Sequence, residues 1–189
     1  MTHQELEETL YKIFNNVNEW LKFGEAKNFG LLSLNAAIMF GFSQTTFDSN
    51  SLVKIIGYYV FAPFALLSSL LSLISLFPIL STIEKGSAIK GVLARLCNLI
   101  DKETSFENIH FYGYLRNIDE NEFIAKFQLK TNSTLAFNKF EEELVVQILY
   151  NSRITWLKYQ FFKLSAFLSL LGILLCPFAL LGLKIYKTL

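Results

Sequence analysis

Charged residues are scarce in this chain of 189 residues, where they make up only 17%. A soluble domain usually carries about 25% charged residues. Hydrophobic residues reach 52%, aromatic residues 15%, and the mean hydropathy is +0.38. Only 3 prolines accompany 19 phenylalanines, which excludes a disordered or collagen-like chain. The surplus of apolar side chains indicates a protein that faces lipid.

Cysteine and histidine are also rare, with two residues of each kind. Cys97 and Cys176 do not have metal-ligand spacing, so a zinc site or a disulfide framework is not expected. The chain lacks a glycine-rich phosphate loop, a paired metal-ligand motif and a nucleophile elbow. His110 stands beside two aromatic residues and is more typical of a core or surface histidine than of a general base. We therefore expect no enzyme, with no catalytic residue, no metal and no cofactor.

A strong charge of either sign is absent as well, because the net charge is +1. The molecule as a whole has no basic field of the kind that drives nonspecific binding to DNA. A binding site for an anionic partner must therefore be sought in local groups of basic residues.

Three stretches meet or approach the requirement of roughly 20 mostly apolar residues for a helix that crosses a bilayer. They run from about Phe29 to Phe42, from about Ile55 to Leu80, and from about Leu164 to Leu183. The N-terminus, MTHQELEETL, is acidic and does not resemble a cleavable signal peptide. The sequence thus predicts a mainly α integral membrane protein with three transmembrane helices.

The distribution of basic residues predicts the orientation of these spans. With the N-terminus inside, all basic residues except Lys54, Lys184 and Lys187 lie in the cytoplasm. Because basic residues near span ends favour the cytoplasmic side, we expect a multi-pass protein of the bacterial inner membrane with a cytoplasmic N-terminus.

The residues before the first span predict an amphipathic helix. Apolar or small residues recur there at spacings of 4, 3, 4, 3 and 4, which is the seam of a heptad helix. They are Leu6, Leu10, Ile13, Val17, Trp20 and Gly24. Such a helix either packs on the cytoplasmic domain of its own chain or associates with a second copy.

The domain organisation that follows has four parts: an N-terminal cytoplasmic helix at 1–28, a transmembrane hairpin at 29–83, a cytoplasmic sensing domain at 84–160, and a third transmembrane helix with a short tail at 161–189. The sensing domain is expected to be mostly helical, with α+β as an alternative. Residues 89–100 fit a short amphipathic helix, whereas IHFYGYL suits a buried strand or an extended segment.

Local signals predict two further helices in and beyond the sensing domain. Asp119 and Glu122 form a capping pair for a helix that carries Phe123 and Phe127. From about Leu135 the chain has no glycine before Gly172 and no proline before Pro177. A single helix is therefore expected to leave the sensing domain and become the third span, which would link the domain mechanically to the membrane.

Polar and small residues inside the spans have two interpretations. In lipid, helices associate through small residues and interhelical hydrogen bonds, and a pore needs a polar stripe that can hydrate. Asn35 near the middle of a span, and Ser68, Ser72 and Ser75 on one face, are candidates for either role. Rows of small residues that could join subunits are Ser33, Ala37 and Gly41, and Ser165, Ser169, Gly172, Cys176 and Ala179.

Basic and aromatic residues of the sensing domain could bind a nucleotide, the former at a phosphate and the latter by stacking on a base. The basic candidates are Lys90, Arg95, Arg116, Lys126, Arg153 and Lys158, and the aromatic candidates are Tyr112 and Tyr114. Acidic residues are nearly as frequent in this region, so ordinary solvated surface remains the alternative for each one. Trp20, Glu25 and Lys27 stand at the expected water boundary, where they could couple the two parts or only anchor the helix.

Several segments resemble the transmembrane effector family of the Pycsar antiphage systems. The similarity is carried by NVNEWLKFGEAKNFGLLSLNAAIMFGF, with Asn18, Trp20, Glu25, Lys27, Leu31, Leu34 and Asn35 as the matching residues. Weaker matches follow at Phe77 and Pro78, at Phe111 and Tyr112, and at Gln147, Ile148, Lys158 and Tyr159 in VVQILYNSRITWLKYQ. Where the family usually has a short Phe-Phe-Gly type segment, this chain has HFYGYL.

The resemblance implies an antiviral defense effector of an abortive-infection system that impairs the inner membrane when a nucleotide messenger changes in level. It implies cyclic CMP or cyclic UMP as the messenger and a nucleotide cyclase or related nucleotidyltransferase as the functional partner. We expect a homo-oligomer that opens a pore or disrupts the bilayer. The alternatives are an ion channel held closed by an oligonucleotide from a partner nucleotidyltransferase, or a membrane anchor or adaptor that does not conduct.

Overall fold

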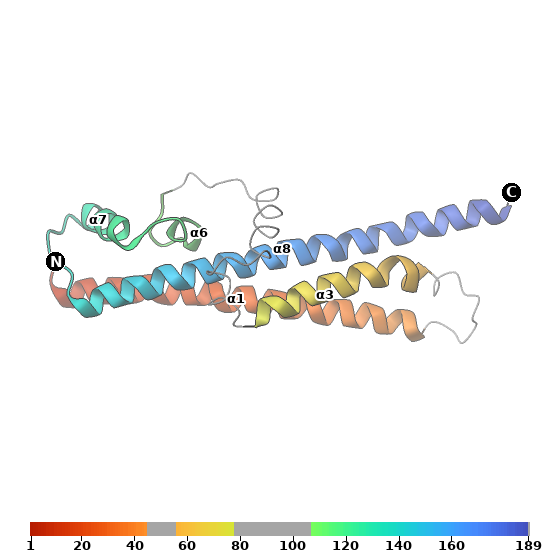
Figure 1. Cartoon of the computed structure of the whole chain (residues 1–189), viewed down its shortest axis with the longest axis horizontal. Helices are drawn as coiled ribbons and strands as arrows, with labels where there is room; N and C mark the ends of the chain where they lie inside the picture. The colour runs from red at the N-terminus through yellow and green to blue at the C-terminus, as the bar shows by residue number, and fades with distance from the viewer. Residues whose placement is uncertain (45–55, 78–106, 189) are drawn as a thin grey trace. The chain divides into compact units, whose positions relative to one another are not determined.

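The computed structural model describes residues 1–44, 56–77 and 107–188, and every regular element in those ranges is a helix. The elements are α1 (His3–Gln44), the π-helical η1 (Gly57–Phe61), α3 (Ala62–Leu76), α6 (Tyr112–Leu115), α7 (Glu120–Thr131) and α8 (Lys139–Thr188). Figure 1 shows α1 and α8 as the two long helices. The mainly α prediction is confirmed, whereas the expected helix at 89–100 lies outside the described residues.

The chain divides into two compact units. Unit 1 comprises Met1–Gly24 and Ile79–Tyr159, and unit 2 comprises Glu25–Pro78 and Gln160–Leu189. The divisions fall inside α1 and inside α8, and neither helix is broken there. Both long helices therefore contribute to both units.

Unit 1 has the core of a water-soluble domain. The first four heptad positions of α1 are fully buried, in agreement with the predicted amphipathic helix, whereas Trp20 remains 37% exposed. These residues pack with side chains of α7, α8 and the segment around α6. The buried cluster contains Leu6, Leu10, Ile13, Val17, Ile109, Leu115, Ile118, Phe123, Phe127, Leu144, Val145, Ile148 and Leu149.

The cap predicted for α7 is confirmed. The Asp119 carboxylate accepts a hydrogen bond from the Glu122 backbone N–H at 2.8 Å, and Phe123 and Phe127 are buried. The helix ends at Thr131 and is followed by Asn132, whose φ of 48° is left-handed, a conformation that asparagine tolerates better than most residues.

The strand or extended segment expected at IHFYGYL is wrong, because Ile109 and His110 lie in a turn and residues 112–115 form the short helix α6. Phe111 is still extended, with φ −107° and ψ 119°. From that residue the backbone turns, since the Phe111 carbonyl accepts from the N–H groups of Tyr114 and Leu115. Aromatic content favoured a strand, but the local turn bonds and the burial of Leu115 decide the conformation.

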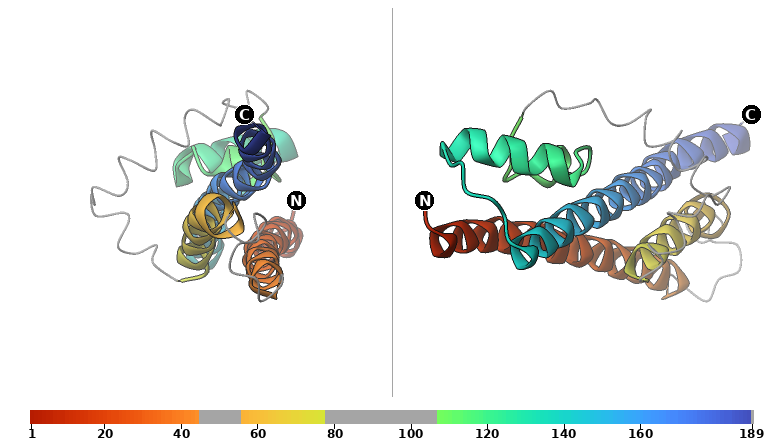
Figure 2. Two further views of the ribbon diagram at one scale, coloured as in Figure 1. Left: turned by 90° about the vertical axis from the view of Figure 1, so that its right-hand side faces the viewer. Right: turned by 60° about the vertical axis from the view of Figure 1, so that its left-hand side comes forward.

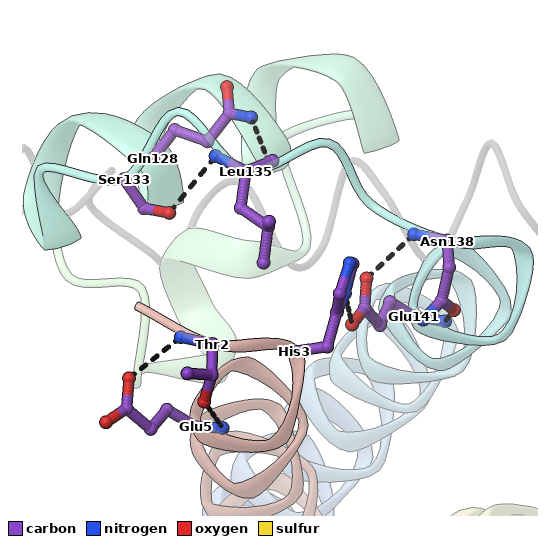
Figure 3. A network of polar contacts seen from close by, with 8 residues as sticks. All are labelled: Thr2, His3, Glu5, Gln128, Ser133, Leu135, Asn138 and Glu141. Atoms are coloured by element: carbon purple, nitrogen blue, oxygen red, sulfur yellow. Dashed lines mark hydrogen bonds and ion pairs between the residues drawn. The ribbon is translucent and has the colours of Figure 1, made fainter.

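A reciprocal capping box starts α8. The Glu141 carboxylate accepts from the Asn138 N–H at 2.7 Å, and the Asn138 side chain accepts from the Glu141 N–H at 3.0 Å. Glu141 is fully buried and also contacts His3 Nδ1 at 2.8 Å, so the beginnings of α1 and α8 are joined (Figure 3). The predicted long helix is confirmed, because α8 runs from Lys139 to Thr188 as a single helix.

Replacing Asp119 with alanine is expected to destabilise unit 1 by about 1 kcal/mol, because the Glu122 N–H loses its acceptor. Thermal unfolding of the purified protein in detergent measures this loss. Asn121→Ala is the matched control, since Asn121 is exposed in the same first turn of α7. Equal melting temperatures for the two variants would contradict the role of the cap.

Unit 2 has the reverse distribution of polarity. Its buried positions include many polar side chains, whereas large apolar side chains cover its surface. The buried polar residues are Asn28, Asn35, Ser68, Ser72, Ser75, Gln160, Ser165 and Ser169. The exposed apolar residues include Phe29, Leu34, Phe40, Leu66, Leu67, Leu70, Leu73, Phe167, Leu170, Ile173, Leu174, Phe178, Leu181 and Ile185. This arrangement is typical of helices that face lipid and bond to one another inside.

Two helices, and not the predicted three, are long and apolar enough to be candidate membrane spans within the described residues. They are Gly57–Leu76 and the apolar part of Lys139–Leu183. The stretch expected at 29–42 is not among them, because it is short and is interrupted by Asn35. Within this stretch Phe29, Leu34 and Phe40 are exposed, whereas the Asn35 amide is buried.

Contacts between α1 and the η1–α3 segment show that the two run antiparallel. Asn35 contacts Ser68, whereas Phe42, later in α1, contacts Phe61, earlier in the chain than Ser68. At the same end, a Cβ placed on Gly57 would lie 2.5 Å from the Phe42 ring. A glycine is thus required where the π-helical turn meets α1.

Helix α8 is likewise antiparallel to α3 and hence parallel to α1. Ser169 contacts Ser68, and Gly172, further along α8, packs against Phe61 and Phe64. A Cβ on Gly172 would lie 2.9 Å from Phe64 Cβ, so the absence of a side chain allows this close approach. Figure 2 shows the three helices of unit 2 in two further views.

Candidate functional site

An aromatic cluster lies in unit 1 and joins α1, α6 and α8. The Tyr112 and Tyr159 rings stack with centroids 5.3 Å apart, and Trp20 lies 5.7 Å from Tyr112 and 6.2 Å from Tyr159. Phe111 contacts Tyr112 at 4.8 Å. Trp20 and Tyr112 remain partly exposed whereas Tyr159 is buried. The cluster therefore offers aromatic faces to a flat ligand.

The α1 backbone comes close to α8 beside this cluster. A Cβ on Gly24 would lie 3.2 Å from the Tyr159 ring and 3.7 Å from Lys158 Cβ. Gly24 is the last heptad position of α1 and the last residue of this helix in unit 1. A change in the aromatic cluster would therefore act where α1 and α8 touch.

Two other predicted ligand residues have aromatic or ionic neighbours in unit 1. The Arg116 guanidinium carbon lies 4.0 Å from the centroid of the Trp156 ring, a cation–π arrangement. Tyr114 hydrogen-bonds to Lys126, which also contacts Glu122 at 2.9 Å. The hydrogen bond to Tyr114 raises the pKa of Lys126 above its usual value, and the bond to Glu122 raises it further. This side chain is therefore a cation at neutral pH.

The remaining predicted ligand residues are not gathered with these. Lys90 and Arg95 lie outside the described residues. Arg153 is exposed on α8, and Lys158 is only 6% exposed. Tyr112 and Arg116 thus remain the predicted residues with the clearest setting for a planar anionic ligand.

The three residues predicted at the water boundary lie on either side of the division between the units in α1. Trp20 belongs to unit 1, and Glu25 and Lys27 are half-buried in unit 2. The Lys27 ammonium lies 5.4 Å from the centroid of the Phe162 ring, a contact within unit 2.

A ring of hydrogen bonds joins the three helices of unit 2. Asn35 donates to Ser68 Oγ at 2.9 Å, and Ser169 Oγ donates to Asn35 Oδ1 at 2.7 Å. Ser68 Oγ lies 2.8 Å from Ser169 Oγ and also 2.8 Å from the Ser165 carbonyl oxygen. All four residues are at least 97% buried. Asn35, the most polar residue predicted in a span, is therefore bonded within its own chain.

The other small and polar residues of the spans divide between inside and outside. Ser72 and Ser75 are buried on the same face of α3 as Ser68. Of the small-residue rows, Ser165, Ser169 and Gly172 are buried within the chain, whereas Ser33, Ala37 and Gly41 are exposed.

Sequence reasoning did not assign several residues that contact the predicted ones. Tyr159 was noted only as part of a motif, and Trp156 and Phe111 were not proposed as ligand contacts. Ser169 appeared in a row of small residues without its bond to Asn35. The contacts of Tyr112 with Trp20 and Tyr159 join segments far apart in sequence, so no local spacing could have revealed them.

A known protein family matches this chain. The family model of the Pycsar effector protein domain matches residues 9–184, nearly the whole chain and both units. This chain belongs to the Pycsar effector family. It is therefore an effector of an antiphage cyclic-nucleotide signalling system, which implies a cyclic nucleotide signal from a partner cyclase. Family membership and the two apolar helices together make this Pycsar effector a membrane protein. No curated protein and no solved structure matches it.

Proposed function

We propose that this Pycsar effector is a membrane protein without enzymatic activity that binds a cyclic nucleotide through unit 1 and impairs the inner membrane through unit 2. The observation that carries the proposal is the continuity of α1 and α8. Each helix runs without a break from a unit with a water-soluble core into a unit with an apolar surface. A change in unit 1 thus has a continuous helical route to unit 2.

The aromatic cluster is the proposed site of the messenger. A pyrimidine base would stack on Tyr112 and Trp20, which are partly exposed. Arg116, one turn after Tyr112, would pair with the cyclic phosphate. A ligand changes the membrane state only if it binds two arrangements of the protein unequally. The Tyr159 contact with Gly24 supports such a difference, because it ties the cluster to the meeting point of α1 and α8.

The proposed topology places unit 1 in the cytoplasm. Helix α3 runs antiparallel to the other two helices of unit 2, so α1 and α8 enter that unit at the same end. An N-terminus inside then leaves most basic residues in the cytoplasm, as the positive-inside rule favours. Several copies would act together, with the exposed row Ser33, Ala37 and Gly41 as one surface for helix association.

Membrane potential in bacterial cells tests the proposal. Cells express the chain with an active pyrimidine nucleotide cyclase or with a catalytically inactive variant of the same cyclase, and a potential-sensitive dye reports depolarisation. We expect depolarisation only with the active cyclase. Depolarisation only with the inactive cyclase would indicate a channel that the messenger holds closed. Its absence in both strains at equal expression would indicate an anchor that does not conduct.

A further inference from the structure

The buried polar side chains of unit 2 lie on one side of the Asn35 ring. On α3, Ser72 and Ser75 follow Ser68. On α1, the buried Asn28 precedes Asn35. Because α3 is antiparallel to α1 and α8, these positions, with Ser165 and Gln160 before Ser169 on α8, extend toward the end of unit 2 where α1 and α8 enter. We name these side chains, together with the ring itself, the polar seam: Asn28, Asn35, Ser68, Ser72, Ser75, Gln160, Ser165 and Ser169.

Three hydroxyl groups in the polar seam have no hydrogen-bond partner among the described protein groups. They belong to Ser72, Ser75 and Ser165, whose side chains are 0%, 4% and 0% exposed. A buried hydroxyl without a hydrogen-bond partner destabilises the folded protein, and such groups are commonly satisfied by water. The three hydroxyls lie within one short stretch of two helices, α3 and α8. These hydroxyls therefore point to a bound ligand that can donate and accept hydrogen bonds.

On the other side of the Asn35 ring the interior is apolar. The buried face of α3 and η1 continues there with Ala65, Ala62 and Phe61, and Phe61 is 0% exposed. Phe61 contacts Phe42 at 5.6 Å between ring centroids and lies against Gly172. An apolar constriction of this kind stops ions because water leaves it readily.

We propose that the polar seam is a water-binding half-channel inside a single subunit, which ends at the Asn35 ring and is closed beyond it by Phe61. From Ser68 to Ser75 the seam covers about 10 Å, at 1.5 Å per residue, of the about 30 Å that a bilayer core measures. Water in the seam satisfies the hydroxyls of Ser72, Ser75 and Ser165. Ion passage then requires that the Asn35 ring open and that Phe61 move away, and this inference rests on the proposed placement of unit 2 in the membrane.

Accessibility of single cysteines tests the half-channel without a cyclase or a messenger. In a background with Cys97→Ser and Cys176→Ser, the positions compared are Ser72→Cys and Ser75→Cys in the seam, Ala65→Cys beyond the ring, and Leu70→Cys on the apolar surface. Protein in lipid vesicles is treated with a charged, membrane-impermeant thiol reagent from the side that carries the N-terminus.

The two seam cysteines are expected to react at least about tenfold faster than the other two, because only a thiolate reacts and dry surroundings suppress its formation. Equal, slow reaction at all four positions would overturn the half-channel and show a dry interface. Fast reaction at Ala65→Cys from the same side would overturn the end of the half-channel at the Asn35 ring, because Ala65 lies between Ser68 of that ring and Phe61.

Ion leak from vesicles gives a second measurement. Phe61→Ala is expected to raise the leak of a monovalent cation without any nucleotide, whereas Leu66→Ala, which removes a lipid-facing side chain that is 63% exposed, is expected to leave it unchanged. Equal leak in the two variants would overturn the role of Phe61. If the cells show no depolarisation that depends on the cyclase, the proposed function fails, but the labelling pattern still decides whether the half-channel exists.

Discussion

Replacement of Gly172 by leucine is expected to abolish depolarisation by this effector and to lower the stability of unit 2. A side chain at this position would meet Phe64 Cβ at 2.9 Å and the Phe61 ring at 3.2 Å, so α8 and α3 would have to separate. Forcing extra atoms into a well-packed interior typically costs about 1–3 kcal/mol. Separation would also stretch the nearby bond of Ser68 to Ser169. Thermal unfolding in detergent and the depolarisation assay in cells measure the two effects.

Gly182→Leu is the matched control for this experiment. It makes the same substitution in the same helix, at a position where a Cβ has no described neighbour within 4 Å. We expect Gly182→Leu to retain the melting temperature and the activity of the unchanged protein. If Gly172→Leu behaves like Gly182→Leu, the close contact between α3 and α8 is not what holds unit 2 together.

Replacement of Tyr112 by alanine is expected to weaken binding of the cyclic nucleotide by about tenfold or more. Stacking of a base on an aromatic ring is worth about 1–3 kcal/mol, and each 1.4 kcal/mol corresponds to about a factor of ten in affinity. Isothermal calorimetry of the protein in detergent, with cyclic CMP and cyclic UMP as titrants, measures the change. In cells the same variant should need more cyclase to depolarise.

Two variants separate stacking from general damage to unit 1. Tyr112→Phe keeps the ring and should bind nearly as well as the unchanged protein. Tyr11→Ala removes a tyrosine of α1 that is 42% exposed and lies outside the aromatic cluster, so it should have no effect. Unchanged affinity in Tyr112→Ala would place the messenger elsewhere in the chain.

The parts of the fold that depend on near neighbours in sequence could be predicted. The heptad spacing of Leu6, Leu10, Ile13 and Val17 predicted a buried helix face, and the Asp119 cap and the unbroken run into α8 were visible in the same way. These features follow from the helical period and from bonds between residues three or four apart. The division of the chain into four domains and the individual ligand contacts stay predictions.

The parts that depend on register between distant helices could not be predicted. Asn35 and Ser169 are 134 residues apart in sequence. Their hydrogen bond exists only because the register of the parallel helices α1 and α8 brings the two side chains together. The first span was overestimated for a different reason, since the apolar stretch at 29–42 is short and contains Asn35, which lowers its hydropathy. At α6, aromatic residues suggested a strand, but turn bonds that begin at Phe111 produced a helical turn instead.

The unbroken course of α1 and α8 also constrains how this protein can change its length during evolution. One inserted residue between Val17 and Asn28 would rotate everything that follows in α1 by about 100°. Leu6, Leu10 and Ile13 would keep their places while Asn35 turned toward lipid. Length changes should therefore survive only when α1 and α8 gain the same number of residues in a step that restores the angular phase, such as about seven, because a change in one helix alone would move Asn35 along the axis and away from Ser169. Single insertions should accumulate in the connections between helices.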